Sequence, residues 1–122
     1  MAKMFLSAGL LAVLLAALAA GCQSAPPAPK TDAELGLKPQ QARGRRIYNV
    51  QCIACHEPYS SLERNGPSLQ GMYNKRQLVS GAPANDERVR DAIVVGRAKM
   101  PAYGHMLSQE QLDDLIAYLH TL

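Results

Sequence analysis

The stretch VQCIACH, residues 50–56, decides how the rest of the chain is interpreted. Its Cys52, Cys55 and His56 bring two thiols and an imidazole within five positions, although the 122 residues include only three cysteines and three histidines. Three kinds of site use such a cluster: a redox-active dithiol, one half of a zinc site, and the attachment point of a larger group. Residues outside the stretch have to distinguish among them.

A zinc site and a redox dithiol find little support elsewhere in the chain. Structural zinc needs about four ligands, usually as two separated pairs. The remaining His105 and His120 are fifteen residues apart and form no second pair, and Cys22 ends an apolar leader. A thioredoxin-like dithiol is expected beside a βαβ pattern, and no segment has the alternation typical of a strand. Both interpretations are therefore disfavoured.

The third kind of site fits the pattern better. Cys-x-x-Cys-His is typical of c-type haem attachment, in which the two thiols bind the vinyl groups of one haem and the histidine coordinates its iron. Composition agrees, because the chain has no Trp and its single Phe5 lies in the leader. A small domain with so few large apolar side chains favours a cofactor in its core. We predict one covalent haem c at Cys52, Cys55 and His56.

The first 21 residues are typical of an export signal. Lys3 supplies a basic start, residues 4–20 are apolar apart from one serine, and small residues precede Cys22. The end of this leader, LAAGC at residues 18–22, resembles the lipobox of bacterial lipoproteins, which implies that Cys22 becomes the lipidated first residue. The sequence thus predicts an exported bacterial protein, periplasmic and lipid-anchored to a membrane.

Two alternatives for the leader stay open. Residues 17–19 offer an ordinary A-x-A cleavage site, which would leave Cys22 near a soluble N-terminus. The leader could also be retained as a membrane anchor, although residues 4–20 are shorter than the roughly 20 residues of a spanning helix. Lipidation has the advantage that it explains the odd cysteine.

The chain divides into three predicted parts. Residues 1–21 form the signal peptide, residues 22–38 a lipid-anchored N-terminus with a Pro/Ala-rich tether, and residues 39–122 the folded domain. With Lys3 removed, 12 basic and 10 acidic side chains remain. So balanced a surface lacks the basic face that nucleic acid requires, and we expect a monomer that binds no nucleic acid.

Helical periodicity predicts an all-α domain. Residues 40–52 and 72–79 are expected to be helical, a third helix begins at an Asn85 cap and ends before Pro101, and a capping box at Ser108 opens the last one. The last helix carries apolar residues at positions i, i+3, i+4 and i+7, which are Leu112, Leu115, Ile116 and Leu119.

Residues 40–122 resemble a class I monohaem cytochrome c. In that family the helix before Cys-x-x-Cys-His crosses the C-terminal helix through a small residue and an aromatic one. Gly44 and Tyr48 match this pair, and Leu115 and Tyr118 match their partners. The resemblance implies a small cytochrome c fold in which three to five helices pack around one covalently attached haem.

The same resemblance implies the other haem-binding residues. NGPSLQG, residues 65–71, resembles the loop whose proline carbonyl accepts a hydrogen bond from the ligand histidine, and this role falls to Pro67 towards His56. KMPAYG resembles the Met-Pro loop of the sixth ligand, so His56 and Met100 are the implied axial ligands of the iron. The alternatives for the sixth ligand are Met106, Met72 and His105.

Iron held by His56 and Met100 has no open coordination site. The implied function is therefore one-electron transfer between transient redox partners, and the protein is not expected to be an enzyme. One alternative is a haem c subunit of a multisubunit oxidoreductase, such as a terminal oxidase or a sulfur-oxidising complex. Another is a small-gas-binding or peroxidatic haem protein, which would require Met100 to dissociate.

Overall fold

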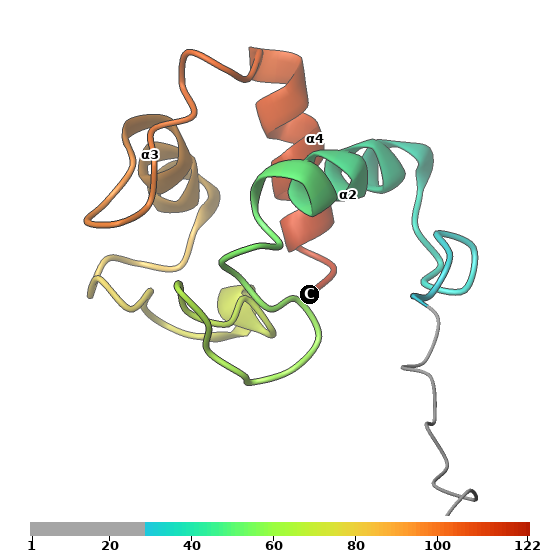
Figure 1. Ribbon diagram of the computed structural model, residues 1–122, viewed down its shortest axis with the longest axis horizontal. Coiled ribbons are helices and arrows are strands. Elements are labelled where there is room, and N and C mark those ends of the chain that lie inside the picture. The colour runs from blue at the N-terminus through green and yellow to red at the C-terminus, as the bar shows by residue number, and fades with distance from the viewer. Residues whose placement is uncertain (1–28) are drawn as a thin grey trace, which may run out of the picture.

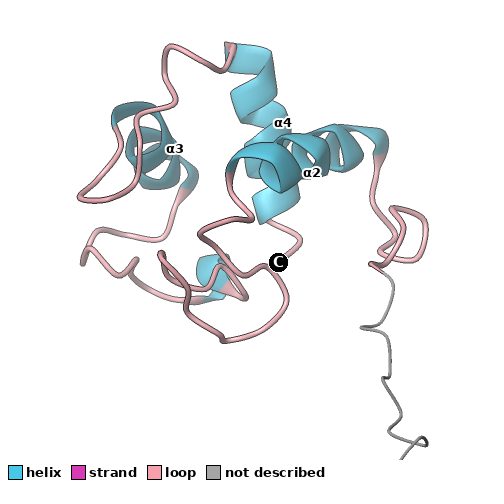
Figure 2. Ribbon diagram, viewed as in Figure 1, coloured by secondary structure: helices cyan, strands magenta, loops and turns pink. Residues whose placement is uncertain are grey.

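Three helices and one short turn make up the regular structure of the residues that the structure describes. The computed structural model describes residues 29–122 and contains α2 (Pro39–Gln51), the 3-10 turn η1 (Met72–Asn74), α3 (Asp86–Val95) and α4 (Gln109–Leu119) (Figures 1 and 2). Within these residues there is no strand, only two isolated bridges. The prediction of an all-α fold is confirmed.

Two of the sequence predictions fall outside this region. The signal peptide, residues 1–21, and the lipidation site Cys22 both lie outside the described residues. Across residues 29–122, no helix combines the length and apolar character needed to cross a membrane.

The centre of the fold is the crossing of α2 and α4, which Figure 1 shows at a steep angle. Gly44 makes the close approach possible, because a Cβ at this position would overlap the backbone carbonyl of Asp114 and lie 2.8 Å from the Cβ of Tyr118. One turn later, the rings of Tyr48 and Tyr118 pack with their centroids 5.3 Å apart. The predicted contact of a small residue and an aromatic one is therefore present.

An ion pair lies beside this crossing. Arg43 donates from Nε and Nη2 to the two carboxylate oxygens of Asp114 at 2.7 and 2.8 Å. Asp114 is almost completely buried, and the hydrogen bonds from Arg43 hold the pKa of its carboxyl below the usual value. The two-pronged geometry restricts how α2 can rotate on α4.

The other two predicted helix starts have the expected caps. The Asn85 side chain accepts a hydrogen bond from the Arg88 amide at the start of α3, and Ser108 and Gln111 form a reciprocal capping box at the start of α4. Both helices bury their apolar stripes. The buried apolar side chains of these two helices are Val89, Ile93, Leu112, Leu115, Ile116, Tyr118 and Leu119.

The short predicted helix over residues 72–79 is wrong apart from its first turn. Only Met72–Asn74 is helical, and Lys75 already has an extended backbone. Residues 76–84 form a small loop instead, in which the Leu78 amide donates to the Ala82 carbonyl at 2.8 Å. A left-handed glycine turns this loop, and helical propensity in so short a segment cannot compete.

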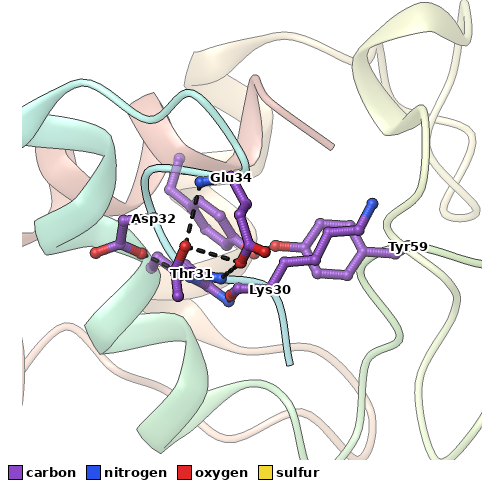
Figure 3. A network of polar contacts seen from close by, with 7 residues as sticks. Lys30, Thr31, Asp32, Glu34 and Tyr59 are labelled. Atoms are coloured by element: carbon purple, nitrogen blue, oxygen red, sulfur yellow. Dashed lines mark hydrogen bonds and ion pairs between the residues drawn. The ribbon is translucent and has the colours of Figure 1, made fainter. Parts of the chain in front are cut away.

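The end of the predicted tether folds onto the domain. Thr31 and Glu34 form reciprocal hydrogen bonds, as Figure 3 shows, and Leu37 packs against the core. Arg45 of α2 then donates to Asp32 at 2.6 Å and to the Lys30 carbonyl. We call residues 30–37 the N-terminal strap. The predicted tether of residues 22–38 therefore ends in a folded segment.

Candidate functional site

The predicted attachment residues lie in one tight turn at the end of α2. The amides of Cys55 and His56 both donate to the carbonyl of Cys52, at 3.0 and 2.9 Å, so the chain reverses direction within the motif. Cys52 and Cys55 form no disulfide bond. The turn thus gathers two sulfurs and one imidazole at the junction of α2 with the long loop that follows.

The geometry also bears on the two alternatives, a redox-active dithiol and a zinc site. Burial raises the pKa of the Cys52 thiol to about 11, and neighbouring Cys55 adds to the shift. A redox-active dithiol needs the opposite, a thiol with a lowered pKa. Among residues 29–122, no three His, Cys, Asp or Glu side chains are placed to share a metal ion. Neither a catalytic dithiol nor a zinc site is therefore supported.

The imidazole of His56 is held in a defined orientation. Its Nδ1 donates to the carbonyl of Pro67 at 2.8 Å, which is the contact expected from the sequence. The donation leaves Nε2 with the lone pair that can bind a metal. That this bond tunes an iron ligand stays a prediction.

Gly66 is a second residue that shapes this imidazole, and sequence reasoning assigned it only to a turn. A Cβ at Gly66 would lie 2.5 Å from Cε1 and 2.9 Å from Nδ1 of His56. Its amide also donates to the Cys55 carbonyl at 2.9 Å, which fixes the loop against the motif. The ring therefore lies flat against a backbone that has no side chain. The sequence signal that could have revealed this role is a glycine directly before the proline that was implied as the hydrogen-bond acceptor.

Two tyrosine hydroxyls hold the ends of the motif. The Tyr48 hydroxyl donates to the His56 carbonyl at 2.8 Å, and the Tyr103 hydroxyl donates to the Gln51 carbonyl at 3.0 Å. The Gln51 carbonyl lies directly before Cys52, and the His56 carbonyl lies at the other end of the motif. The sequence predicted the packing of the Tyr48 ring but not this use of its hydroxyl.

The loop of Met100 folds back on α3. The Met100 amide donates to the Arg97 carbonyl at 2.7 Å, and the Arg97 amide returns a bond of 3.2 Å. Gly96 permits this turn, because its φ is +75° and a Cβ there would lie 2.6 Å from the Met100 carbonyl oxygen. The amide of Tyr103 then donates to Ile93, so the loop is attached to the helix by its backbone.

Burial separates the candidates for the sixth ligand. Met100 and Met72 are partly buried and pack against the core, whereas Met106 is 51% exposed and His105 is exposed. Met72 belongs to η1 on the segment that follows the Pro67 loop. Met100 thus combines partial burial with the Met-Pro loop, while the exposed candidates would have to turn inward first.

The third histidine is engaged elsewhere. The His120 ring stacks on Tyr73 with centroids 3.8 Å apart, and its Nε2 lies 2.7 Å from a carboxylate oxygen of Asp86. These contacts connect the end of α4 to η1 and to the start of α3. His120 is therefore a structural link and not a candidate iron ligand.

The residues around the motif fit a large, flat, apolar group. Nine large apolar side chains of the described residues are buried, whereas between residues 49 and 88 only Pro58 is buried. The long loop instead offers partly buried apolar side chains, and so does the segment that carries Met100. These side chains are Leu69, Met72, Tyr73 and Leu78 in the loop, Val94 at the end of α3, and Met100 and Tyr103 in the segment after it. A fold with a Cys-x-x-Cys-His motif in one turn, an oriented imidazole and such a lining defines a c-type haem protein.

Comparison with known proteins identifies the family. The family model described as cytochrome c oxidase, cbb3-type, subunit III matches residues 39–119, which is more than half of the chain. The chain therefore belongs to this cytochrome c family. The resemblance expected from the sequence is confirmed at this level, as is the prediction of one covalent haem c with its iron.

Curated relatives are similar over the same part of the chain. A "Cytochrome c6-like" protein of Nostoc sp. (strain PCC 7120 / SAG 25.82 / UTEX 2576) is 30% identical over 76 residues, which cover 62% of this chain and 65% of the relative. "Cytochrome c6" of Gloeothece citriformis is 26% identical, with 62% and 66% covered. "Cytochrome c6" of Rippkaea orientalis is 27% identical, with 64% and 67% covered. The chain thus spans about two thirds of the length of the curated relatives it matches.

Proposed function

We propose that this protein is a one-electron carrier whose haem is attached through Cys52 and Cys55 and ligated by His56 and Met100. The observation that carries the proposal is the hydrogen bond from His56 Nδ1 to the Pro67 carbonyl. This bond sets the tautomer of the imidazole and makes Nε2 a stronger and better oriented donor to iron.

The other residues have distinct tasks towards the same group. Gly66 and Pro67 keep the imidazole from rotating, and Tyr48 holds the backbone of His56. The turn after Gly96 holds the loop that carries Met100 against α3. When bound, the haem supplies an iron that cycles between Fe(III) and Fe(II), and a thioether ligand favours the reduced state.

This arrangement supports electron transfer rather than chemistry at the iron. Both proposed ligands come from segments that are fixed by backbone hydrogen bonds, so both can remain in place in the two oxidation states. If His56 and Met100 both bind the iron, a substrate would have no access to the metal. The redox partners of the protein would dock transiently over a small area.

A specific observation also favours a second candidate function. The family match is to subunit III of a cbb3-type cytochrome c oxidase, and the alternative is that this chain is a haem c subunit of such a complex. Extraction with mild detergent discriminates between the two. A stoichiometric partner that co-purifies with the protein would indicate a subunit, whereas a free monomer would indicate a shuttle.

We further propose export to the periplasm and lipid attachment at Cys22. The support is the sequence pattern of the leader, together with the need of c-type haem attachment for an extracytoplasmic compartment. Replacing Cys22 with Ser should release the protein from membranes, as measured by fractionation and immunoblotting. An unchanged membrane fraction would indicate a retained leader instead.

Haem staining on a denaturing gel tests the central proposal. The wild-type protein should retain haem through denaturation, and Cys52→Ser or Cys55→Ser should weaken or abolish the stain. Met100→Ala should keep the stain but bind CO rapidly when reduced. A wild-type protein without stain would refute haem attachment, and a reduced wild-type protein that binds CO rapidly would favour gas binding or peroxidatic activity.

A further inference from the structure

The Tyr103 side chain joins two segments that are far apart in sequence. Its hydroxyl donates to the carbonyl of Gln51 at 3.0 Å, and Gln51 is the last residue of α2, directly before Cys52. Among the described residues, this is the one side-chain hydrogen bond between residues 97–106 and residues 51–56. The contact therefore links the Met100 loop to the haem attachment segment.

The Gln51 carbonyl depends on this hydroxyl because its usual partners are used elsewhere. The last carbonyls of a helix lack partners within the helix. Here the amides of Cys55 and His56, which could turn back towards it, both donate to Cys52 instead. The Tyr103 hydroxyl supplies the missing donor at a partly buried position, where an unpaired carbonyl would be costly.

Tyr103 is itself fixed at both of its backbone groups. Its amide donates to the Ile93 carbonyl of α3 at 2.9 Å, and its carbonyl accepts from Met106 and Leu107 at 2.9 and 3.0 Å. A tyrosine phenol is protonated at neutral pH, and burial raises the pKa of this one further, so the hydroxyl can donate. One residue thus connects α3, the approach to α4 and the end of α2.

We propose that Tyr103 is a positioning residue for the sixth ligand, because its hydroxyl sets the separation between the Met100 loop and the Cys52–His56 turn. This inference rests on the proposed function, in which Met100 ligates the iron. A thioether is a weak ligand, so a loop that drifts from the attachment segment loses it readily. The backbone bonds to α3 hold the loop on one side, and Tyr103 holds it on the haem side.

Tyr103→Phe in the haem-loaded protein tests the proposal, because it removes only the hydroxyl. The readouts are the weak sulfur-to-iron absorption band of the oxidised protein and the affinity for added imidazole. Imidazole competes with the Met100 thioether for the sixth position of the iron. Loss of one hydrogen bond of ordinary strength should weaken the band and tighten imidazole binding about tenfold. Met100→Ala, which lacks the thioether, gives the imidazole affinity expected for a fully open sixth position.

Tyr59→Phe is the matched control. Its hydroxyl also lies in a partly buried hydrogen bond, at 2.8 Å from the Tyr118 hydroxyl, and this bond does not involve the Met100 loop. A general loss of packing would affect both variants alike, whereas a positioning role affects imidazole binding in Tyr103→Phe alone. Equal imidazole affinities in the two variants would overturn the proposal.

The outcomes separate this inference from the function on which it rests. A wild-type protein that lacks the sulfur-to-iron band refutes Met100 ligation and with it the role of Tyr103. A wild-type protein that has the band, with Tyr103→Phe unchanged, overturns the positioning role alone. If the Tyr103→Phe variant cannot be produced as a folded protein, hydrogen exchange of the wild-type protein tests the proposal instead. The amides of Tyr103 and Gly104 should exchange as slowly as those of α3, and fast exchange would overturn the proposal.

Discussion

At the scale of single residues, the site depends on the lack of a Cβ at Gly66. His56 has the backbone of Gly66 against one side of its ring and the Pro67 carbonyl at Nδ1. The ring cannot move away from a side chain at position 66 without stretching the bond to Pro67. Steric contact and hydrogen bonding therefore specify the same orientation, and both come from one dipeptide.

Replacing Gly66 with Ala tests this orientation. The new Cβ would lie 2.5 Å from Cε1 of His56, so the ring or the loop must shift, at a cost of about 1–3 kcal/mol. We expect a lower midpoint in urea unfolding and a changed haem spectrum. Asn65→Ala is the control, because Asn65 is exposed on the same loop. Identical spectra in the Gly66→Ala and wild-type proteins would contradict the role of Gly66.

At the scale of elements, the crossing of α2 and α4 supports everything attached to it. The Cys52–His56 turn continues directly from α2, and Tyr118 of α4 packs on Tyr48, whose hydroxyl holds His56. A change in the distance between the two helices is therefore transmitted to the imidazole. Gly44 and Asp114 control that distance.

Gly44→Ala should destabilise the domain strongly. Alanine improves helix propensity by about 1 kcal/mol, but its Cβ would overlap the backbone carbonyl of Asp114, which cannot rotate away. We expect a net loss of at least about 2 kcal/mol in the free energy of unfolding. Asn49→Ala, on the exposed face of α2, should cost far less. A Gly44→Ala protein as stable as the wild type would show that the helices can separate freely.

The Arg43–Asp114 pair predicts a dependence of stability on pH. The hydrogen bonds from Arg43, with further contributions from Gln40 and Arg46, lower the pKa of Asp114 in the folded state. Stability from this group is then fully present above the unfolded pKa of about 3.9 and is lost as the pH falls through the lower folded value. Urea unfolding should show that the wild type loses more stability from pH 5 to pH 2 than Asp114→Asn does.

The neighbouring carboxylate provides the control for this titration. Asp113 is exposed and pairs with Arg90 at 2.6 Å on the outer face of α4, where solvent screens the interaction. Asp113→Asn should therefore follow the wild-type pH profile closely. If Asp114→Asn also followed it, the buried pair would contribute nothing to acid stability.

At the scale of the whole molecule, the N-terminal strap decides where the chain leaves the domain. Arg45 has a side chain only 12% exposed and joins Asp32 and the Lys30 carbonyl to α2. If the chain is anchored at Cys22, a bound strap shortens the free tether by the eight residues from 30 to 37. The strap would then limit how far the haem domain reaches from the membrane.

Arg45→Ala should release the strap. Trypsin cleaves after Lys30, whose carbonyl is held by Arg45 in the wild type, and loss of a partly exposed pair should speed that cleavage about fivefold. Mass spectrometry of the early products measures the rate at this position. Arg46→Ala, which alters an exposed residue of the same helix, should leave the rate unchanged. Equal rates in both variants would show that Arg45 does not hold the strap.

The sequence by itself determined the elements that arise from local spacing. The helices with caps at Asn85 and Ser108 follow from periodicity and hydrogen bonds within a few residues, and the Cys52–His56 motif defines its chemistry over five positions. Two expectations about these elements were wrong. The helix expected over residues 72–79 is mostly a loop in which the chain pairs with itself, and the third helix ends at Val95, before the expected stop at Pro101, because Gly96 turns the chain.

Only the tertiary structure decided which distant groups meet. Gly66 lies against His56, Tyr103 reaches Gln51 across 52 positions, and Arg45 holds a strap that resembled a free tether in sequence. These contacts depend on the approach of backbones and on carbonyls left unpaired at helix ends, which neither composition nor periodicity records. The motif thus determined that a haem is bound, and packing determined how its surroundings are held in place.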